Sequence, residues 1–377
     1  MPRSIFAVIA FCGLQSHDKQ KWGLVKLFNH NASQKHLQMS TTNGNSLNTM
    51  ISFATIGTSW ITSSWIESAE STGRWKLNAV FSRSAETAKS FAGKHNISKT
   101  HTKLEDLLSD SEVRAVYIAS PNSLHFEQAK AILSAGKHVI IEKPACSTEK
   151  ELDALFKIAK EKEVFLLEAF RHIHEVNFKI LKDSLSKLGP IYGASLNYAS
   201  FSSRYNNVLN GETPNIFNLD FSGGSLVDLG VYPVSAAIAL FGPPKAQTYK
   251  PFIIKTGADG GGLILLEYDT FGVSINASKV YTSTAPSEVY GEKGTLRCNG
   301  VTDISTVEFW EASTKKSNEL AQQKAGLNMS EEADVYAAII NKNDEKAAQE
   351  LEQISRATQK VTESLRKANG LTFAVEK

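Results

Sequence analysis

The chain has 377 residues, of which 42% are hydrophobic and 21% are charged, and its formal net charge is +2. A chain of this length usually folds around more than one hydrophobic core, which predicts two domains. A net charge near zero does not produce the positive electrostatic potential that attracts nucleic acid. No uninterrupted apolar run reaches the roughly 18 residues of a membrane span. Neither nucleic acid nor a membrane is therefore an expected partner.

Cysteine usage also narrows the class of protein. Cys12, Cys146 and Cys298 lie far apart in the chain, and their spacing fits no metal-ligand pattern. We therefore expect reduced thiols in a cytoplasmic protein, and no metal site.

The first 49 residues form an extension that differs from the rest of the chain. An apolar stretch over residues 4–14 follows Arg3 and precedes a polar segment rich in lysine and asparagine. A secretory signal, a mitochondrial presequence and a translation start at Met39 or Met50 are open alternatives. We expect residues 1–49 to be disordered or loosely packed. The cytoplasmic location would change to mitochondrial or secreted if residues 1–38 are a true presequence.

Strands and helices alternate from residue 51 onward. We predict strands over 52–57, 76–82, 115–119, 138–142 and 164–168, interspersed with helices over 60–71, 85–95, 104–109, 123–135 and 148–162. Such alternation indicates parallel βαβ units in an α/β fold. Residues 50–171 are therefore predicted to form a doubly wound parallel sheet of the Rossmann type, which binds dinucleotides.

The turn after the first predicted strand is a candidate pyrophosphate site. It reads Gly57-Thr58-Ser59-Trp60-Ile61 and keeps only the first of the three glycines of the dinucleotide fingerprint. Gly57 permits the tight turn, and the N-terminus of the following helix offers backbone N–H groups to phosphate oxygens. A plain strand-to-helix turn without a ligand is the alternative.

The end of the second predicted strand bears on the choice of cofactor. It carries Ser82 and Arg83 and lacks the carboxylate that accepts hydrogen bonds from an NAD ribose. A hydroxyl and a planar cation suit the 2′-phosphate of NADP instead. We therefore expect NADP, with NAD as the alternative cofactor and a merely solvated arginine as the alternative interpretation of Arg83.

Polar residues follow the strand predicted over 115–119. Ser120, Pro121 and Asn122 come directly after it, where Pro121 stiffens the loop and Asn122 offers amide donors and an acceptor. His125 lies on the first turn of the next helix, where we expect it to position other groups through hydrogen bonds. We do not expect it to act as an acid or base.

The strand predicted over 138–142 ends in Glu142 and is followed by Lys143 and Pro144. Strands of this fold present reactive groups at their carboxyl ends, and Pro144 fixes the backbone beside the amine. Arg171 follows the last predicted strand. It is a candidate contact to substrate or phosphate, with an interdomain salt bridge as the alternative.

Residues 172–377 are predicted to form a second domain of the α+β class. A helix over 177–186 precedes strands over 191–203, 248–255, 262–269 and 272–281 and a strand–turn–strand over 288–296. The hairpin turn at residues 269–272 favours an open, mostly antiparallel sheet. Helices over 331–341 and 344–368 complete the domain, and their mixed charge suits a solvated face.

Gly223 and Gly224 precede a predicted helix that carries two further candidates. Asp228 and Tyr232 are four residues apart, so their side chains are expected on one helix face. The alternative is a buried tyrosine whose hydroxyl satisfies a hydrogen bond in the core.

Two segments together resemble the signatures of the Gfo/Idh/MocA oxidoreductases. Residues 136–144 contain Glu142-Lys143-Pro144, and residues 223–232 are similar to the family's Gly-Gly-x-Leu-x-Asp-x-Gly-x-His motif with tyrosine in place of histidine. In having Tyr232, the chain is similar to the branch that contains glucose-fructose oxidoreductase and dimeric dihydrodiol dehydrogenase. The resemblance covers residues 50–300.

This resemblance implies a site, a substrate class and an assembly. It implies that Lys143 lies beside the nicotinamide of NAD(P), that the turn at Ser120 borders the nicotinamide ribose, and that the segment at Arg171 lines the nicotinamide end. The implied substrate is a sugar, polyol or cyclic diol. Subunits of the family meet through the outer face of the second sheet, which implies a homodimer or homotetramer.

The implied chemistry is hydride transfer between a carbinol carbon and C4 of the nicotinamide. Tyr232 would take the hydroxyl proton, provided that a cation stabilises its phenolate. Lys143 would be that cation and would stabilise charge on the substrate oxygen, while Asp228 would orient Lys143 or a sugar hydroxyl. The alternative is a regulatory protein of the same fold that senses dinucleotide without turnover; the presence of both Lys143 and Tyr232 favours an enzyme.

Overall fold

The computed structural model describes residues 49–324 and 326–377. Its first sheet is parallel, with the strand order β3-β2-β1-β4-β5-β6. The strands are β1 (Ile51–Ile56), β2 (Trp75–Phe81), β3 (Thr100–His101), β4 (Ala115–Ile118), β5 (His138–Glu142) and β6 (Leu166–Ala169). This order confirms the predicted doubly wound Rossmann sheet. The expectations for residues 1–48 lie outside the described residues.

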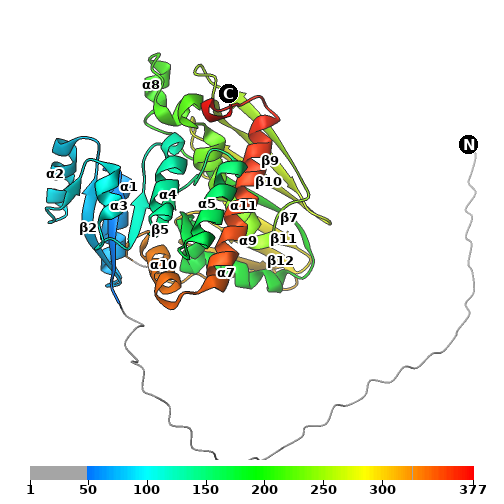
Figure 1. The fold of residues 1–377 in the computed structure, drawn as a ribbon. Coiled ribbons are helices and arrows are strands. Elements are labelled where there is room, and N and C mark those ends of the chain that lie inside the picture. The colour runs from blue at the N-terminus through cyan, green and yellow to red at the C-terminus, as the bar shows by residue number, and fades with distance from the viewer. Residues whose placement is uncertain (1–48, 325) are drawn as a thin grey trace, which may run out of the picture. The chain divides into compact units, whose positions relative to one another are not determined.

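Helices pack on the two faces of this sheet, α1 (Trp60–Ser71), α2 (Ala85–Lys94), α3 (Leu104–Ser109), α4 (His125–Ser134) and α5 (Glu149–Glu161) (Figure 1). Neighbouring strand residues such as Phe53 and Ala54 belong to different apolar clusters, because successive side chains point to opposite faces. α2 begins at the predicted residue, Ala85. The Ser84 hydroxyl accepts a hydrogen bond from the Thr87 N–H at 3.2 Å at the start of α2.

The second sheet has eight strands in the order β14-β13-β12-β11-β7-β10-β9-β8. They are β7 (Ile191–Ala199), β8 (Ala246–Ile253), β9 (Asp259–Glu267), β10 (Gly272–Ser278), β11 (Ser287–Gly291), β12 (Gly294–Cys298), β13 (Val307–Glu311) and β14 (Lys316–Glu319). β10 pairs with β7 in parallel and the other pairs are antiparallel, which confirms the predicted mostly antiparallel sheet. β13 and β14 extend it beyond the predicted strands.

The backbone just before α9 (Val231–Phe241) forms a π-helical turn, which is wider than the α-helical turn that was predicted. This turn over Leu226–Gly230 precedes α9, where one regular helix was expected. Gly224 has φ +141°, and a Cβ there would lie 2.3 Å from Asp259 Oδ1. Asp259 is buried, and its other oxygen accepts a hydrogen bond from the Leu226 N–H at 2.7 Å. Glycine thus lets a buried carboxylate cap the turn that carries the predicted site residues.

One apolar stretch was not anticipated from the sequence. Residues Leu219–Phe241 are long and apolar enough to cross a membrane by length and composition, but 72% of the most apolar window is buried inside the protein. Val234 and Ala237 of this stretch lie in the core behind the second sheet. The stretch is accordingly the core helix of the C-terminal half.

The last two helices, α10 (Ser330–Lys342) and α11 (Glu345–Lys367), return to the first sheet (Figure 1). Ala333 and Tyr336 of α10 share a core with Trp65 and Trp75, and the Trp75 Nε1–H donates to the Ala333 carbonyl at 2.8 Å. The expectation of a solvated face is therefore wrong for α10. The indole rings of Trp65 on α1 and Trp75 on β2 need an apolar cover, and a helix from the far end of the chain supplies it.

Candidate active site

The carboxyl end of β5 and the π-helical turn bring three of the predicted site residues together. The Lys143 ammonium donates to the Asp228 carbonyl at 2.7 Å and to Asp228 Oδ1 at 2.8 Å. The same nitrogen lies 4.8 Å from the centre of the Tyr232 ring, over its face. The cation is thus held by a carboxylate, a carbonyl and an aromatic ring, which are favourable neighbours for an ammonium group.

A second lysine, which the sequence analysis missed, completes this group. Lys279 directly follows β10 and is buried, and its ammonium contacts Asp228 Oδ2 and lies 5.4 Å from the centre of the Phe217 ring. Asp228 therefore bridges two lysines, one on each carboxylate oxygen. The available signal was a lysine at the carboxyl end of a strand that otherwise carries small and apolar residues.

Tyr232 is packed among aromatic rings. Its ring lies 5.1 Å from that of His172 and 5.3 Å from that of Tyr198, centre to centre. Burial raises the pKa of its hydroxyl, although the Lys143 cation acts in the opposite direction. Within residues 49–324 and 326–377 the hydroxyl has no direct hydrogen-bond partner. The ring, and not the hydroxyl, makes the close contact with Lys143.

Glu142 points away from the lysine that follows it. Its Oε1 accepts a hydrogen bond from the buried Tyr117 hydroxyl at 2.6 Å, and burial raises the pKa of the carboxyl group. Tyr117 in turn stacks on Trp65 at 4.7 Å. This geometry suits support of the strand end more than direct contact with a cofactor.

The first strand-to-helix turn has features that fit a pyrophosphate. Gly57 has φ +114°, and a Cβ there would lie 2.6 Å from the Ala119 carbonyl oxygen, so only glycine fits. Ser59 is the N-cap of α1 but makes no side-chain capping bond, and the first turn contains no acidic residue. The N–H groups at this helix end are therefore free of side-chain acceptors among the described residues, as an anion site requires.

The neighbouring candidate residues differ in their exposure to solvent. The Trp60 side chain, on the first residue of α1, is 77% exposed, whereas Ile61 packs against the core of the first sheet. Ser82 and Arg83 follow β2, the neighbour of β1 in the sheet, and Arg83 is exposed. Arg83 forms no ion pair with any residue in the described ranges, so its guanidinium is available to a phosphate.

The loop after β4 is joined to the C-terminal half. The Asn122 side-chain amide donates to the Ser222 carbonyl at 3.0 Å, and the Ser222 hydroxyl contacts that of Ser147 at 2.6 Å. The Ser120 hydroxyl donates to Gln128 at 2.7 Å. The loop that was expected to border a ribose therefore also ties the two halves of the protein together.

His125 is buried between two loops. Its Nδ1 lies 2.9 Å from the Pro144 carbonyl oxygen and its Nε2 lies 2.9 Å from the Ser120 carbonyl oxygen. Burial lowers the pKa of the ring. A neutral imidazole carries one N–H, so His125 donates to one of these two carbonyls and lies between the loops after β4 and β5, a geometry that suits a positioning residue.

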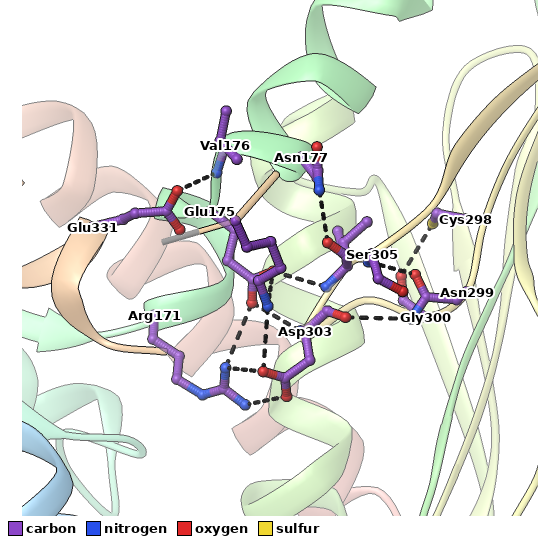
Figure 2. Close-up of polar contacts among 12 residues, drawn as sticks. Arg171, Glu175, Val176, Asn177, Cys298, Asn299, Gly300, Asp303, Ser305 and Glu331 are labelled. Carbon is purple, nitrogen blue, oxygen red and sulfur yellow. Dashed lines mark hydrogen bonds and ion pairs between the residues drawn. The ribbon is translucent and has the colours of Figure 1, made fainter. Parts of the chain in front are cut away.

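Arg171 is engaged by acidic residues of the C-terminal half (Figure 2). Its guanidinium makes two bonds to Asp303, at 3.1 and 2.8 Å, and lies 3.5 Å from Glu175. Lys324 contacts the same two acids. Although burial opposes it, this pairing lowers the pKa of Asp303. The arrangement matches the salt-bridge alternative for Arg171 and leaves its guanidinium little capacity for a ligand.

Two cavities lie outside this cluster. The larger, about 940 Å³, lies among α7 (Val176–Ser184), α9, α10 and α11 and includes none of the predicted site residues in its lining. The smaller, about 460 Å³, is mostly polar and is lined by Arg204, Asn207, Glu212, Thr213, Pro214, Asn215 and Ile216.

Comparisons with known proteins agree with this geometry. A family model described as "Oxidoreductase family, NAD-binding Rossmann fold" matches residues 51–170, and one described as "GFO/IDH/MocA C-terminal domain" matches residues 186–297. The chain is 37% identical to scyllo-inositol 2-dehydrogenase (NADP(+)) IolU of Bacillus subtilis, across 87% of this chain and 99% of that protein. It is 27% identical to trans-1,2-dihydrobenzene-1,2-diol dehydrogenase of Xenopus tropicalis, across 58% and 66% of the two chains.

Solved structures show the same fold. KijD10, a 3-ketoreductase from Actinomadura kijaniata crystallised with TDP-benzene and NADP, matches with a TM-score of 0.70 across 84% of this chain and 97% of that one. The two sequences are 21% identical. At this identity the likeness concerns the arrangement of the two domains and not the substrate.

Proposed function

The chain belongs to the Gfo/Idh/MocA family of NAD(P)-dependent oxidoreductases, and from that premise we propose that it transfers a hydride between NADP and a carbinol or carbonyl carbon of a cyclic polyol or sugar. The observation that carries this proposal is the convergence of Lys143, Asp228 and Tyr232 from two separate parts of the chain. NADP, when bound, supplies or accepts the hydride at C4 of its nicotinamide.

Lys143 is the group that meets the reacting oxygen. An ammonium has three N–H donors, and Asp228 accepts two of them through its carbonyl and Oδ1. The third is left for the substrate oxygen, where a fixed positive charge stabilises the negative charge that develops in the transition state. Asp228 therefore aims Lys143 by accepting hydrogen bonds from its other two N–H groups.

Tyr232 is the proton carrier in this proposal. Because burial raises the pKa of its hydroxyl, the phenol keeps its proton at neutral pH and can donate it to the oxygen of a carbonyl substrate. The reverse reaction requires the phenolate, which becomes available only at alkaline pH. Near neutrality Tyr232 is accordingly in the protonation state that carbonyl reduction requires.

The choice of NADP over NAD and the choice of substrate class rest on separate observations. The exposed Arg83 and the absence of a carboxylate at the end of β2 support NADP over NAD, as does the name of the IolU relative. That relative acts on scyllo-inositol, a cyclic polyol.

The assembly is proposed from the outer face of the second sheet. Tyr192, Leu263, Leu265 and Trp310 are between 42% and 62% exposed on its strands. Several exposed large apolar side chains on one sheet are typical of a contact surface. We propose a homodimer or homotetramer formed through this face, which the molar mass in solution tests.

The proposed activity is tested with purified protein, NADP and NAD in turn, and a panel of inositols, aldoses and cyclic trans-diols with their ketones. We expect a change in absorbance at the reduced-nicotinamide band with NADP and at least one cyclic polyol. Cofactor binding without turnover across the whole panel would instead support a dinucleotide-sensing protein.

A further inference from the structure

Asp228 has two cationic neighbours, and the proposed mechanism uses only one of them. Lys143 binds Oδ1, and Lys279 binds Oδ2 from the opposite side. Lys279 reaches this place because β10 runs parallel to β7 and ends beside the π-helical turn. Its side chain is buried, whereas 27% of the Asp228 side chain is exposed.

Each oxygen of Asp228 has its own partner, which determines how the carboxylate plane is turned. A carboxylate on a short side chain rotates readily about its last bond. If Oδ2 had no partner, this half-exposed group could turn toward water and release Oδ1 from Lys143. With Lys279 in place, both ends of the carboxylate are fixed.

We propose that Lys279 is a positioning residue, which holds Oδ2 of Asp228 so that Oδ1 and the Asp228 carbonyl keep the Lys143 ammonium aimed at the reacting oxygen. This inference rests on the function proposed above. It assigns no contact with substrate to Lys279.

The surroundings of Lys279 argue against a purely space-filling role. Beside the face of Phe217, an apolar residue would fill the same space without the cost of burying a charge. Within the described ranges, the charged groups in reach are Asp228, which favours the ammonium, and Lys143, which opposes it. Burial and Lys143 lower the pKa of Lys279 to about 7.

Because Lys279 changes charge within an accessible pH range, its role can be followed in the pH dependence of turnover. The positioning contact needs the charged amine, so it is complete below the pKa and is lost as the pH rises through it. Turnover in the direction of carbonyl reduction should therefore decline as the pH rises through the pKa of Lys279, and its contact with Asp228 moves that decline to higher pH than burial and Lys143 alone would give. Arginine stays charged throughout this range, so Lys279→Arg should keep the contact and remove that decline.

The first experiment is a double-mutant cycle on the NADP-bound enzyme. We expect Lys279→Met to lower kcat by about 10- to 100-fold, the scale for a slightly misplaced catalytic group, with the KM for NADPH nearly unchanged. In the double variant, Lys279→Met should add little to the effect of Asp228→Asn alone, since both substitutions disrupt the same Lys279–Asp228–Lys143 interaction. Lys250→Met, at an exposed lysine of β8, is the matched control.

The second experiment does not depend on turnover. The rate at which 2,4,6-trinitrobenzenesulfonate modifies Lys143, followed by peptide mass spectrometry, should rise several-fold in Lys279→Met because Lys143 is released. An unchanged rate in a folded variant, or effects of the two substitutions on kcat that multiply independently, would overturn the proposal. Loss of turnover in the wild type on every substrate would reject the proposed function, and the labelling rate would still decide the role of Lys279.

Discussion

The ammonium of Lys143 is oriented before any substrate binds. Its two bonds to Asp228 and its place over the Tyr232 ring leave one N–H donor unassigned. An arrangement that is already fixed in the free protein needs little reorganisation during the reaction, which is the main source of electrostatic catalysis. In the proposed reaction, Lys143 would donate to the reacting oxygen, and the neighbouring Tyr232 would carry the proton.

Tyr232→Phe removes only the hydroxyl and keeps the ring that packs against Lys143. Burial raises the pKa of the hydroxyl, so oxidation of an alcohol should accelerate as the pH rises toward that pKa. We expect the phenylalanine variant to lose this alkaline rise and to turn over about 10²- to 10⁴-fold more slowly. Tyr192→Phe, at an exposed tyrosine, is the control. Retention of the alkaline rise would assign the proton to another group.

Arg83→Ala tests the cofactor assignment. Loss of a charge-assisted contact to the 2′-phosphate should weaken NADP binding by about 1–3 kcal/mol and leave NAD binding almost unchanged. Fluorescence titration of both cofactors measures this difference. Arg114→Ala, at an exposed arginine before β4, is the control. Equal losses for NADP and NAD would show that Arg83 serves the fold and not the phosphate.

The π-helical turn is the element that positions Asp228 and Tyr232. Four residues on a regular helix would place both side chains on one face, as the sequence predicted, and the wider turn changes that spacing. The structure nevertheless brings both to Lys143. The start of the π-helical turn depends on Gly224 and on the buried carboxylate of Asp259.

Gly224→Ala should therefore destabilise the fold by about 2–4 kcal/mol, because it adds a clash with Asp259 to the strain of a positive φ. Gly257→Ala is a matched control, since Gly257 has φ +83° but no atom within 4 Å of its added Cβ. The control should lose only the backbone component, about 1–2 kcal/mol. Urea unfolding compares the two, and equal losses would show that Asp259 does not restrict this position.

The contribution of Glu168, at the end of β6, to the stability of the fold depends on pH. Glu168 is buried, its Oε1 accepts a hydrogen bond from the Ala145 N–H at 2.8 Å, and burial raises its pKa to about 7. A folded-state pKa above the ordinary value means that the folded protein binds this proton more tightly than the unfolded chain. Protonated Glu168 therefore stabilises the folded protein fully below the ordinary pKa of a glutamate, and this contribution is lost as the pH rises to about 7.

Glu168→Gln keeps the acceptor for the Ala145 N–H and cannot ionise. We expect the variant to lose less stability than the wild type between pH 5 and pH 8, by about 2–3 kcal/mol in the free energy of unfolding. Urea unfolding at the two pH values measures this. The same pH dependence in both proteins would mean that Glu168 is ionised without cost in the fold.

At the scale of the whole molecule, local patterns predicted most elements and long-range packing decided the remainder. The alternation from residue 51 onward was sufficient for the Rossmann sheet, and two motifs far apart in sequence identified Lys143, Asp228 and Tyr232. Lys279 was missed because a lysine after a strand usually faces water. Nothing local to α10 indicates that it covers Trp65 and Trp75, which lie more than 250 positions earlier.

The site is assembled only when both halves of the chain have folded. Lys143 comes from the first sheet, and Asp228 and Tyr232 come from the segment that packs on the second. Asn122 and Ser147 fasten the same two halves at Ser222. The proposed catalytic group therefore needs residues from both halves.

Lys143→Met removes the ammonium and keeps most of the side-chain volume, so it isolates the contribution of the Lys143 charge to turnover. We expect the variant to bind NADP with near-normal affinity, whereas turnover falls by about 10²- to 10⁴-fold, as for the loss of a positioned catalytic group. Both quantities are measured on the same preparation. Near-wild-type turnover in a variant that binds NADP would contradict the assignment of Lys143 as the catalytic cation.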